Sequence, residues 1–298
     1  MNKTYLLIYG GGFGDVILSY LMLEAGYIKA LKEIEPNCKI RVAIMSHNPG
    51  AHKIFEHWLL VDEILFKEWD NNPAEFFRYA SEGCTLIGSP GSSQCCDSSR
   101  RWVQELCPVL KDFNYEQPPL YLSPEEQRIA NDIISGGNFV AFHPFGGYQP
   151  RSWQGKVDIK TVIDNLCDAG IRVVLLGGSS DRIVGHTQRL IEQFEYERPG
   201  LVNLVNRHSI MLHSYICSKA DRFIGAMSCF SCVAVAHKIP SLLIALSQDE
   251  SFMNLPVTEQ WAGVTNLYRK NNFQIYYFEK VPNDINDKIL AFCKEKHV

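Results

Sequence analysis

Short apolar runs alternate with amphipathic segments through most of this chain. The run from Thr4 to Tyr9 predicts a buried strand, and the residues after it carry apolar side chains near helical spacing to about Ile34. The alternation continues to about residue 87 and then stops. Further elements expected in this half are strands at 39–45, 63–66 and 84–87 and a helix near 51–58.

The second half repeats the alternation more clearly. The expected strands are 139–143, 172–176, 201–205, 222–225 and 241–246, and helices are expected at about 158–169, 209–219 and 228–237, with another ending near 194. Such alternation is typical of an α/β domain around a parallel sheet, which binds ligands beyond the carboxyl ends of its strands. The loops at 144–153, 177–181 and 225–229 are therefore where binding residues are expected.

A polar, proline-containing segment separates the two halves. Gln117, Pro118 and Pro119 read as a linker, and Ser123 followed by Pro124 is typical of a helix start. The sequence therefore predicts an N-terminal domain at 1–118, a C-terminal domain at 119–280, and a last helix within 281–298 that packs back toward the N-terminal domain.

Composition and charge exclude several classes of protein. The chain has 298 residues, 46% of them hydrophobic, and a formal net charge of -4 with no basic stripe, so nucleic acid is not an expected partner. No apolar run approaches the roughly 20 residues of a transmembrane helix. The run from Tyr5 to Tyr9 is also too short for a signal peptide. We expect a cytoplasmic protein.

The ten cysteines are scattered along the chain, as is typical of reduced thiols. Cys229 and Cys232 have the spacing of a redox pair, but zinc would need a second pair of ligands that no nearby segment offers. We therefore expect no metal site. Cys95 and Cys96 have no explanation in the sequence.

The first strand ends in a glycine turn, Gly10-Gly11-Gly12-Phe13-Gly14, that leads to Asp15. Gly11, Gly12 and Gly14 would let a ligand approach the backbone, and a carboxylate at such a helix start is either an N-cap or a general base. The turn fits neither a dinucleotide fingerprint, whose third glycine would fall on Asp15, nor a phosphate-binding P-loop. Ordinary NAD or ATP binding is not expected, nor is any cofactor.

Two loops of the second half offer groups for a phosphate ligand. Arg151 either clamps a diphosphate with paired hydrogen bonds or is a surface arginine beside a packed Trp153. Gly225 ends an expected strand, and Ser228 and Cys229 open the next helix, whose N-terminus favours phosphate. Alternatively, Ser228 is only a helix cap.

A third loop offers a group for a nucleoside. Asp181 follows Gly178 at the end of another expected strand, where a carboxylate either holds ribose hydroxyls or caps the following helix.

Together these motifs resemble the heptosyltransferase family, glycosyltransferase family 9, over nearly the whole chain. The motifs are the first strand with GGFGD, then HPFGG at 143–147, RSW at 151–153, VVLLGG at 173–178, IGAMS at 224–228 and IP at 239–240. The resemblance implies an α/β fold of the GT-B type, with two facing Rossmann-like domains and a cleft between them. It places the acceptor in the N-terminal domain and a nucleotide-sugar donor in the C-terminal domain.

The resemblance also implies roles for individual residues. Asp15 falls on the family's proposed base, Arg151 on a basic residue that is usually lysine, and Ser228 on the hydroxyl of the phosphate-binding helix start. The implied reaction is a metal-independent, inverting transfer of heptose or a similar sugar from a nucleoside-diphosphate sugar to a saccharide or glycolipid, as in lipopolysaccharide or surface glycan synthesis. A glycolipid acceptor would bring the protein to a membrane surface.

The chain departs from the family pattern at the same helix start. Met227, Cys229 and Cys232 stand where the family commonly has Asp, Gly and His. Two alternatives therefore stay open beside the glycosyltransferase. One is a GT-B-like sugar-nucleotide epimerase or hydrolase, which acts on the donor without an acceptor, and the other is a non-catalytic nucleotide-binding relative.

Overall fold

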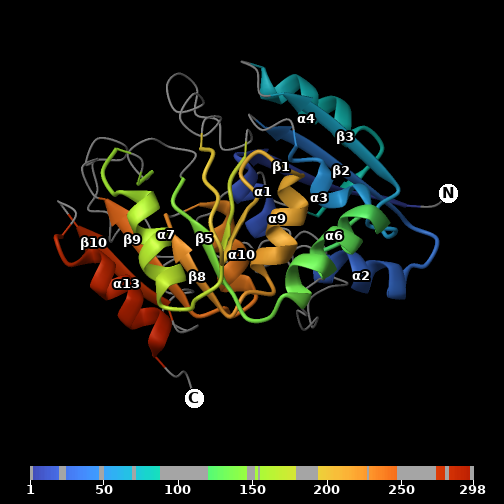
Figure 1. Ribbon diagram of the computed structural model, residues 1–298. Coiled ribbons are helices and arrows are strands. Elements are labelled where there is room, and N and C mark those ends of the chain that lie inside the picture. Colours follow the sequence, from blue (N-terminus) through green and yellow to red (C-terminus); the bar gives the residue numbers. More distant parts are fainter. Residues whose placement is uncertain are drawn as a thin grey trace. The chain divides into compact units, whose positions relative to one another are not determined.

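Parallel β-sheets form the centre of both halves of the chain (Figure 1). The chain divides into unit 1, Met1–Tyr121, and unit 2, Leu122–Val298, close to the boundary expected after residue 118. This computed structural model describes residues 3–19, 25–46, 50–68, 72–87, 120–145, 152–153, 155–178, 194–226, 228–246, 273–278 and 282–295. None of the helices in these ranges has the length and hydropathy needed to cross a membrane.

Unit 1 contains a four-stranded sheet in the order β3-β2-β1-β4. Its strands are β1 Thr4–Gly11, β2 Lys39–Ser46, β3 Glu63–Glu68 and β4 Thr85–Leu86, and its described helices are α1 Phe13–Ser19, α2 Ala25–Ile34, α3 Lys53–Glu56 and α4 Pro73–Ser81. All described pairings are parallel, and Gly11 at the end of β1 lies opposite Ser46 at the end of β2. The central strands are almost continuously buried, as their apolar runs predict.

Unit 2 contains a six-stranded parallel sheet in the order β10-β9-β8-β5-β6-β7. Its strands are β5 Val140–His143, β6 Val173–Leu175, β7 Leu201–Asn203, β8 Arg222–Gly225, β9 Ser241–Leu246 and β10 Phe273–Phe278. The described helices are α6 Pro124–Ser135, α7 Ile159–Asp168, α9 Ile210–Cys217, α10 Cys229–Ala236 and α13 Ile285–Lys294. The helix expected to end near 194 lies outside the described residues, and the sequence analysis missed β10, which pairs with β9.

The C-terminal helix α13 belongs to the core of unit 2. Ile285, Ile289 and Phe292 are buried in the same apolar cluster as residues of α7, and the two helices lie side by side (Figure 1). The buried face of this helix is thus part of the unit 2 core. Its expected packing toward the N-terminal domain stays a prediction.

Two helix starts of unit 2 share one carboxylate. The Ser123 hydroxyl accepts a hydrogen bond from the Glu126 N–H at 3.2 Å, and the Glu126 carboxylate accepts one from the Ser123 N–H at 3.1 Å, so the expected cap is confirmed as a capping box. The other oxygen of Glu126 accepts from the hydroxyl of Ser209, which itself caps α9. Glu126 thereby joins the first turns of α6 and α9.

We expect Ser123→Ala to lower the free energy of unfolding by ~1 kcal/mol, because the Glu126 N–H loses its acceptor. Urea denaturation followed by circular dichroism measures this change. Ser135→Ala, at the last residue of the same helix, is the matched control and should change stability by less than ~0.5 kcal/mol. If the Ser123 variant and the wild type unfold at the same urea concentration, the capping box does not stabilise the protein.

Candidate functional site

Strand order makes the carboxyl ends of β5 and β8 the place where a ligand is expected to bind in unit 2. These strands are neighbours in the sheet although β6 and β7 lie between them in sequence, so the chain reverses its direction of winding at this point. Open α/β sheets bind ligands at such a reversal, because the loops that follow the two strands separate there. His143 ends β5, Gly225 ends β8, and the two residues are paired in the sheet.

The approach of the two strands at this point requires a glycine. A Cβ atom on Gly225 would lie 2.3 Å from the carbonyl oxygen of His143, well inside van der Waals contact. The N–H of Ala226 donates to the same oxygen at 2.9 Å. Gly225 therefore fixes where the chain leaves the sheet to begin α10. The contacts described for it are with the backbone of β5 and hold the two strands together.

Ser228 contacts a histidine that the sequence analysis did not assign to the site. Its hydroxyl lies 2.8 Å from Nδ1 of His143. The N–H of Ser228 donates to the Ser231 hydroxyl at 3.1 Å, and that hydroxyl donates back to the Ser228 carbonyl at 2.6 Å. Ser231, rather than the Ser228 hydroxyl, thus holds the backbone at the start of α10.

Aromatic rings hold His143 in one orientation. The residue is fully buried, and its ring meets Phe230 edge-on at 4.7 Å and Phe145 edge-on at 5.9 Å between centroids. His213 of α9 lies on Phe230 as well, at 6.0 Å, and its Nδ1 accepts from the N–H of Gly177 at 3.5 Å. Two buried imidazoles therefore line the edge where β5, β6 and β8 end.

The other residues expected in the donor site are only partly described. Gly178 follows β6 and Cys229 is the first residue of α10, so both belong to the same carboxyl edge as Ser228. Cys229 and Cys232 are partly exposed and carry reduced thiols. Arg151, Asp181 and Met227 lie outside the described residues. In the described part of the chain, no three histidine, cysteine or carboxylate side chains are grouped so as to hold a metal ion.

Trp153, two residues after Arg151 in the sequence, is held in the core of unit 2. It is fully buried, its indole N–H donates to the Ile244 carbonyl at 3.1 Å, and its backbone N–H donates to the Pro144 carbonyl at 2.9 Å. The tryptophan is therefore a core residue, as the alternative interpretation of this motif expected.

In unit 1 the expected glycine turn is shorter than predicted, because Gly10 and Gly11 belong to β1 and only Gly12 lies between β1 and α1. The helix also begins earlier than expected. Phe13 is its first residue, and the N–H of Val16 donates to the Gly12 carbonyl at 3.2 Å. Gly14 and Asp15 therefore lie in the first helical turn, and the interpretation of Asp15 as an N-cap is wrong. The structure gives the backbone position of Asp15, and the position is one that favours a negative charge because of the helix dipole.

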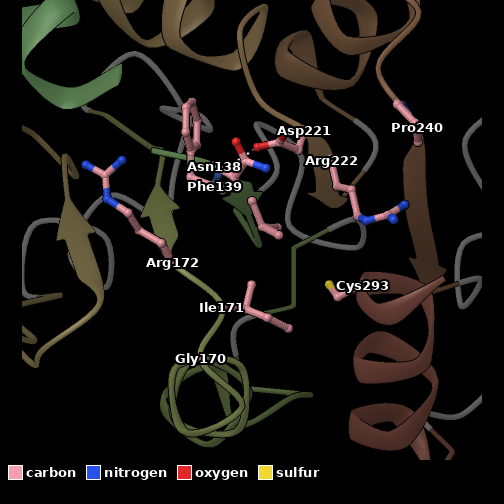
Figure 2. A pocket seen from close by; sticks show the side chains of 10 residues that line it. Asn138, Phe139, Gly170, Ile171, Arg172, Asp221, Arg222, Pro240 and Cys293 are labelled. Atoms are coloured by element: carbon pink, nitrogen blue, oxygen red, sulfur yellow. Dashed lines mark hydrogen bonds between the residues drawn. The ribbon is translucent and has the colours of Figure 1, made fainter. Parts of the chain in front are cut away.

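A cavity of about 510 Å³ lies at the opposite, amino-terminal edge of the unit 2 sheet (Figure 2). The guanidinium groups of Arg172 and Arg222 point to opposite sides of it, and that of Arg172 donates to the Ile133 and Gly137 carbonyls. Burial raises the pKa of the Cys293 thiol, which also lines it, to about 12. The positive charges do not converge on one anion, so this cavity does not have the form of a diphosphate site.

No family model and no curated protein matches the sequence. Several solved structures share its fold over nearly the full length. E. coli ADP-heptose LPS heptosyltransferase II is 13% identical, covers 98% of this chain and 97% of its own, and has a TM-score of 0.59. The glycosyltransferase family 9 protein from Veillonella parvula is 14% identical, with coverages of 99% and 93% and a TM-score of 0.59.

The E. coli heptosyltransferase WaaC, solved with ADP, is 14% identical, covers 97% of each chain and has a TM-score of 0.54. The chain has the heptosyltransferase fold. This finding confirms, for the fold, the resemblance drawn from the sequence motifs. At 13 to 14% identity the likeness to the heptosyltransferase structures concerns the fold alone, so the roles of individual residues rest on their own geometry.

We expect Gly225→Ala to lower the free energy of unfolding by about 1–3 kcal/mol, because the new methyl group meets backbone atoms that have no room to move. Chemical denaturation measures the loss. Gly136→Ala is the control, since the atoms nearest to its Cβ would be those of the flexible Arg172 guanidinium, and it should cost less. A Gly225 variant as stable as the Gly136 variant would contradict the close approach of the strands.

Proposed function

We propose that the protein is a glycosyltransferase that takes a sugar from a nucleoside-diphosphate sugar held by unit 2. The observation that carries the proposal is the position of the α10 N-terminus, directly after Gly225 at the end of β8, where the winding of the sheet reverses. The full-length likeness to the heptosyltransferase fold supports it, since one of those structures was solved with ADP. The acceptor, a saccharide or glycolipid, would bind unit 1.

On the donor side, the chain offers several groups to the diphosphate. The N-terminus of α10 presents backbone N–H groups and a partial positive charge to an anion. In this proposal Ser228, the Cys229 N–H and Arg151 stabilise the charge that develops on the leaving diphosphate, so that no metal ion is required. Gly178 and Asp181 would take the nucleoside at the end of β6.

On the acceptor side, Asp15 acts as the general base. It follows β1, which lies beside β4 in a sheet with its own reversal of winding, and ligands are expected at the carboxyl end of β1 for the same reason as in unit 2. Asp15 accepts the proton of the acceptor hydroxyl while its oxygen attacks the anomeric carbon. The diphosphate leaves from the opposite side, so the sugar's configuration is inverted.

This mechanism requires the two carboxyl edges to face one another across a cleft, the arrangement of a GT-B enzyme. Closure of such a cleft excludes water, which would otherwise hydrolyse the donor. We place the reaction in the cytoplasm, at a membrane surface if the acceptor is a glycolipid, and in the synthesis of lipopolysaccharide or a related surface glycan.

We expect one of ADP, GDP, UDP or CDP to stabilise the protein against heat. A ligand at 100 times its Kd adds ~2.7 kcal/mol to the free energy of unfolding, which raises the Tm by several degrees. Differential scanning fluorimetry with the four nucleotides and their sugars measures the shift. No shift with any of them would remove the donor site and the proposed function with it.

We expect Asp15→Asn to reduce sugar transfer by about 100- to 10,000-fold, because an amide does not accept the proton, while nucleotide binding stays unchanged. Release of nucleoside diphosphate in the presence of a saccharide acceptor measures the rate. Asp287→Asn is the matched control, since Asp287 occupies the corresponding place in the first turn of α13. Unchanged transfer in the Asp15 variant would overturn the base assignment.

Two readouts separate the alternative functions. Release of nucleoside diphosphate that needs no acceptor and does not respond to Asp15→Asn would indicate a hydrolase, and a donor whose sugar is isomerised without an acceptor would indicate an epimerase. Nucleotide binding without any turnover would indicate a non-catalytic relative.

A further inference from the structure

We propose that His143 is a positioning residue of the donor site, which donates a hydrogen bond from Nδ1–H to the Ser228 hydroxyl oxygen and so directs the hydroxyl proton to the diphosphate. The inference rests on the function proposed above. It starts from the 2.8 Å contact between the His143 ring and the Ser228 hydroxyl, which joins the end of β5 to the start of α10.

The direction of this hydrogen bond decides what Ser228 can do. A hydroxyl has one proton to donate and two lone pairs that accept. If Ser228 donated its proton to Nδ1, it would present only lone pairs to the phosphate oxygens, which are acceptors themselves. If the ring donates instead, the Ser228 proton is available to the phosphate.

An anionic diphosphate therefore selects the form of His143 that carries a proton on Nδ1. Both the Nδ1–H tautomer and the imidazolium ion meet this requirement, because each donates from Nδ1. Nucleotide binding and the position of the His143 proton are therefore linked, because the diphosphate favours the form of the ring in which the site binds it more strongly.

The surroundings hold the two side chains in place for this role. The His143 ring is fixed edge-on by Phe145 and Phe230, and its carbonyl oxygen is fixed by the Ala226 N–H. On the other side, the Ser231 hydroxyl satisfies the Ser228 backbone and leaves the Ser228 side chain to the histidine. A hydroxyl whose rotation is restricted in this way loses less entropy when it binds a phosphate oxygen.

The residues next to Ser228 add weight to its hydroxyl. Met227 and Cys229 carry only sulfur atoms, which hydrogen-bond weakly. The hydroxyl of Ser228 is therefore the strongest neutral side-chain donor from 227 to 229, and its orientation matters correspondingly more.

The first test measures the Kd of the nucleoside diphosphate that stabilises the wild type, by titration calorimetry. We expect Ser228→Ala to raise the Kd about tenfold to a hundredfold, the loss typical of a hydrogen bond to a charged group. His143→Phe should raise the Kd nearly as much, and the double variant should bind no worse than Ser228→Ala alone. Unchanged binding by His143→Phe, or effects of the two changes that multiply, would overturn the proposal.

A conservative replacement separates positioning from support of the fold. The amide N–H of His143→Asn can occupy about the place of Nδ1–H, whereas the longer side chain of His143→Gln places its amide nearer to Nε2. We expect His143→Asn to bind the nucleotide within about threefold of wild type and His143→Gln to bind as weakly as Ser228→Ala. Equal Kd values for the Asn and Gln variants would refute the proposal even if His143→Phe does not fold.

Side-chain ¹⁵N NMR tests the proton position directly. We expect Nδ1 of His143 to show the shift of a protonated nitrogen in the nucleotide complex, and an unprotonated Nδ1 there would overturn the proposal. A wild-type protein that binds none of the four nucleotides is a different result, because it removes the proposed function itself.

Discussion

The close approach of β8 to β5 is the constraint on which the candidate site depends. With no side chain at Gly225, the N–H of the next residue reaches the His143 carbonyl, and the chain turns into α10 directly beside the end of β5. That turn places Ser228 within hydrogen-bond distance of the His143 ring. A larger residue at 225 would separate the two strands at their ends and with them the hydroxyl and the imidazole.

Several polar groups are buried at the same edge of the unit 2 sheet. His143, His213 and Ser231 are nearly inaccessible, and each has a hydrogen-bond partner in a different element or in the adjoining turn. Buried polar groups without partners are costly, so the arrangement persists only if the elements keep their places. The edge is therefore preorganised, which the proposed stabilisation of a leaving group would require.

The sequence predicted the sheets well because buried parallel strands are apolar runs, and β5, β6, β8 and β9 all lie within the predicted strands. It missed β10, because that strand follows a long stretch without a clear pattern. It placed the start of α1 too late, since a helix that begins among glycines has few propensity signals to mark its first residue. The contact of α13 with α7 could not be read from the sequence, because the apolar stripe of a helix does not record which element packs against it.

The candidate site was predictable in its glycines and its helix start but not in its histidines. Gly225 and Ser228 carry local signatures, a strand end and a helix N-terminus. His143 was visible only as a polar residue that ends an apolar strand, and its partner lies 85 positions away in the sequence. His213 sits in a helix whose other residues are mostly buried, so nothing in the helix itself distinguishes it from the core.

The shared carboxylate of Glu126 has a consequence for how the chain can be divided. Because this one side chain serves the helix starts at Ser123 and Ser209, the first helix of unit 2 stabilises another whose cap lies 83 positions after Glu126. A proteolytic cut or gene truncation just after residue 126 would thus remove support from α9 as well as α6. A separately produced C-terminal half has to begin before Ser123 to keep both helix starts intact.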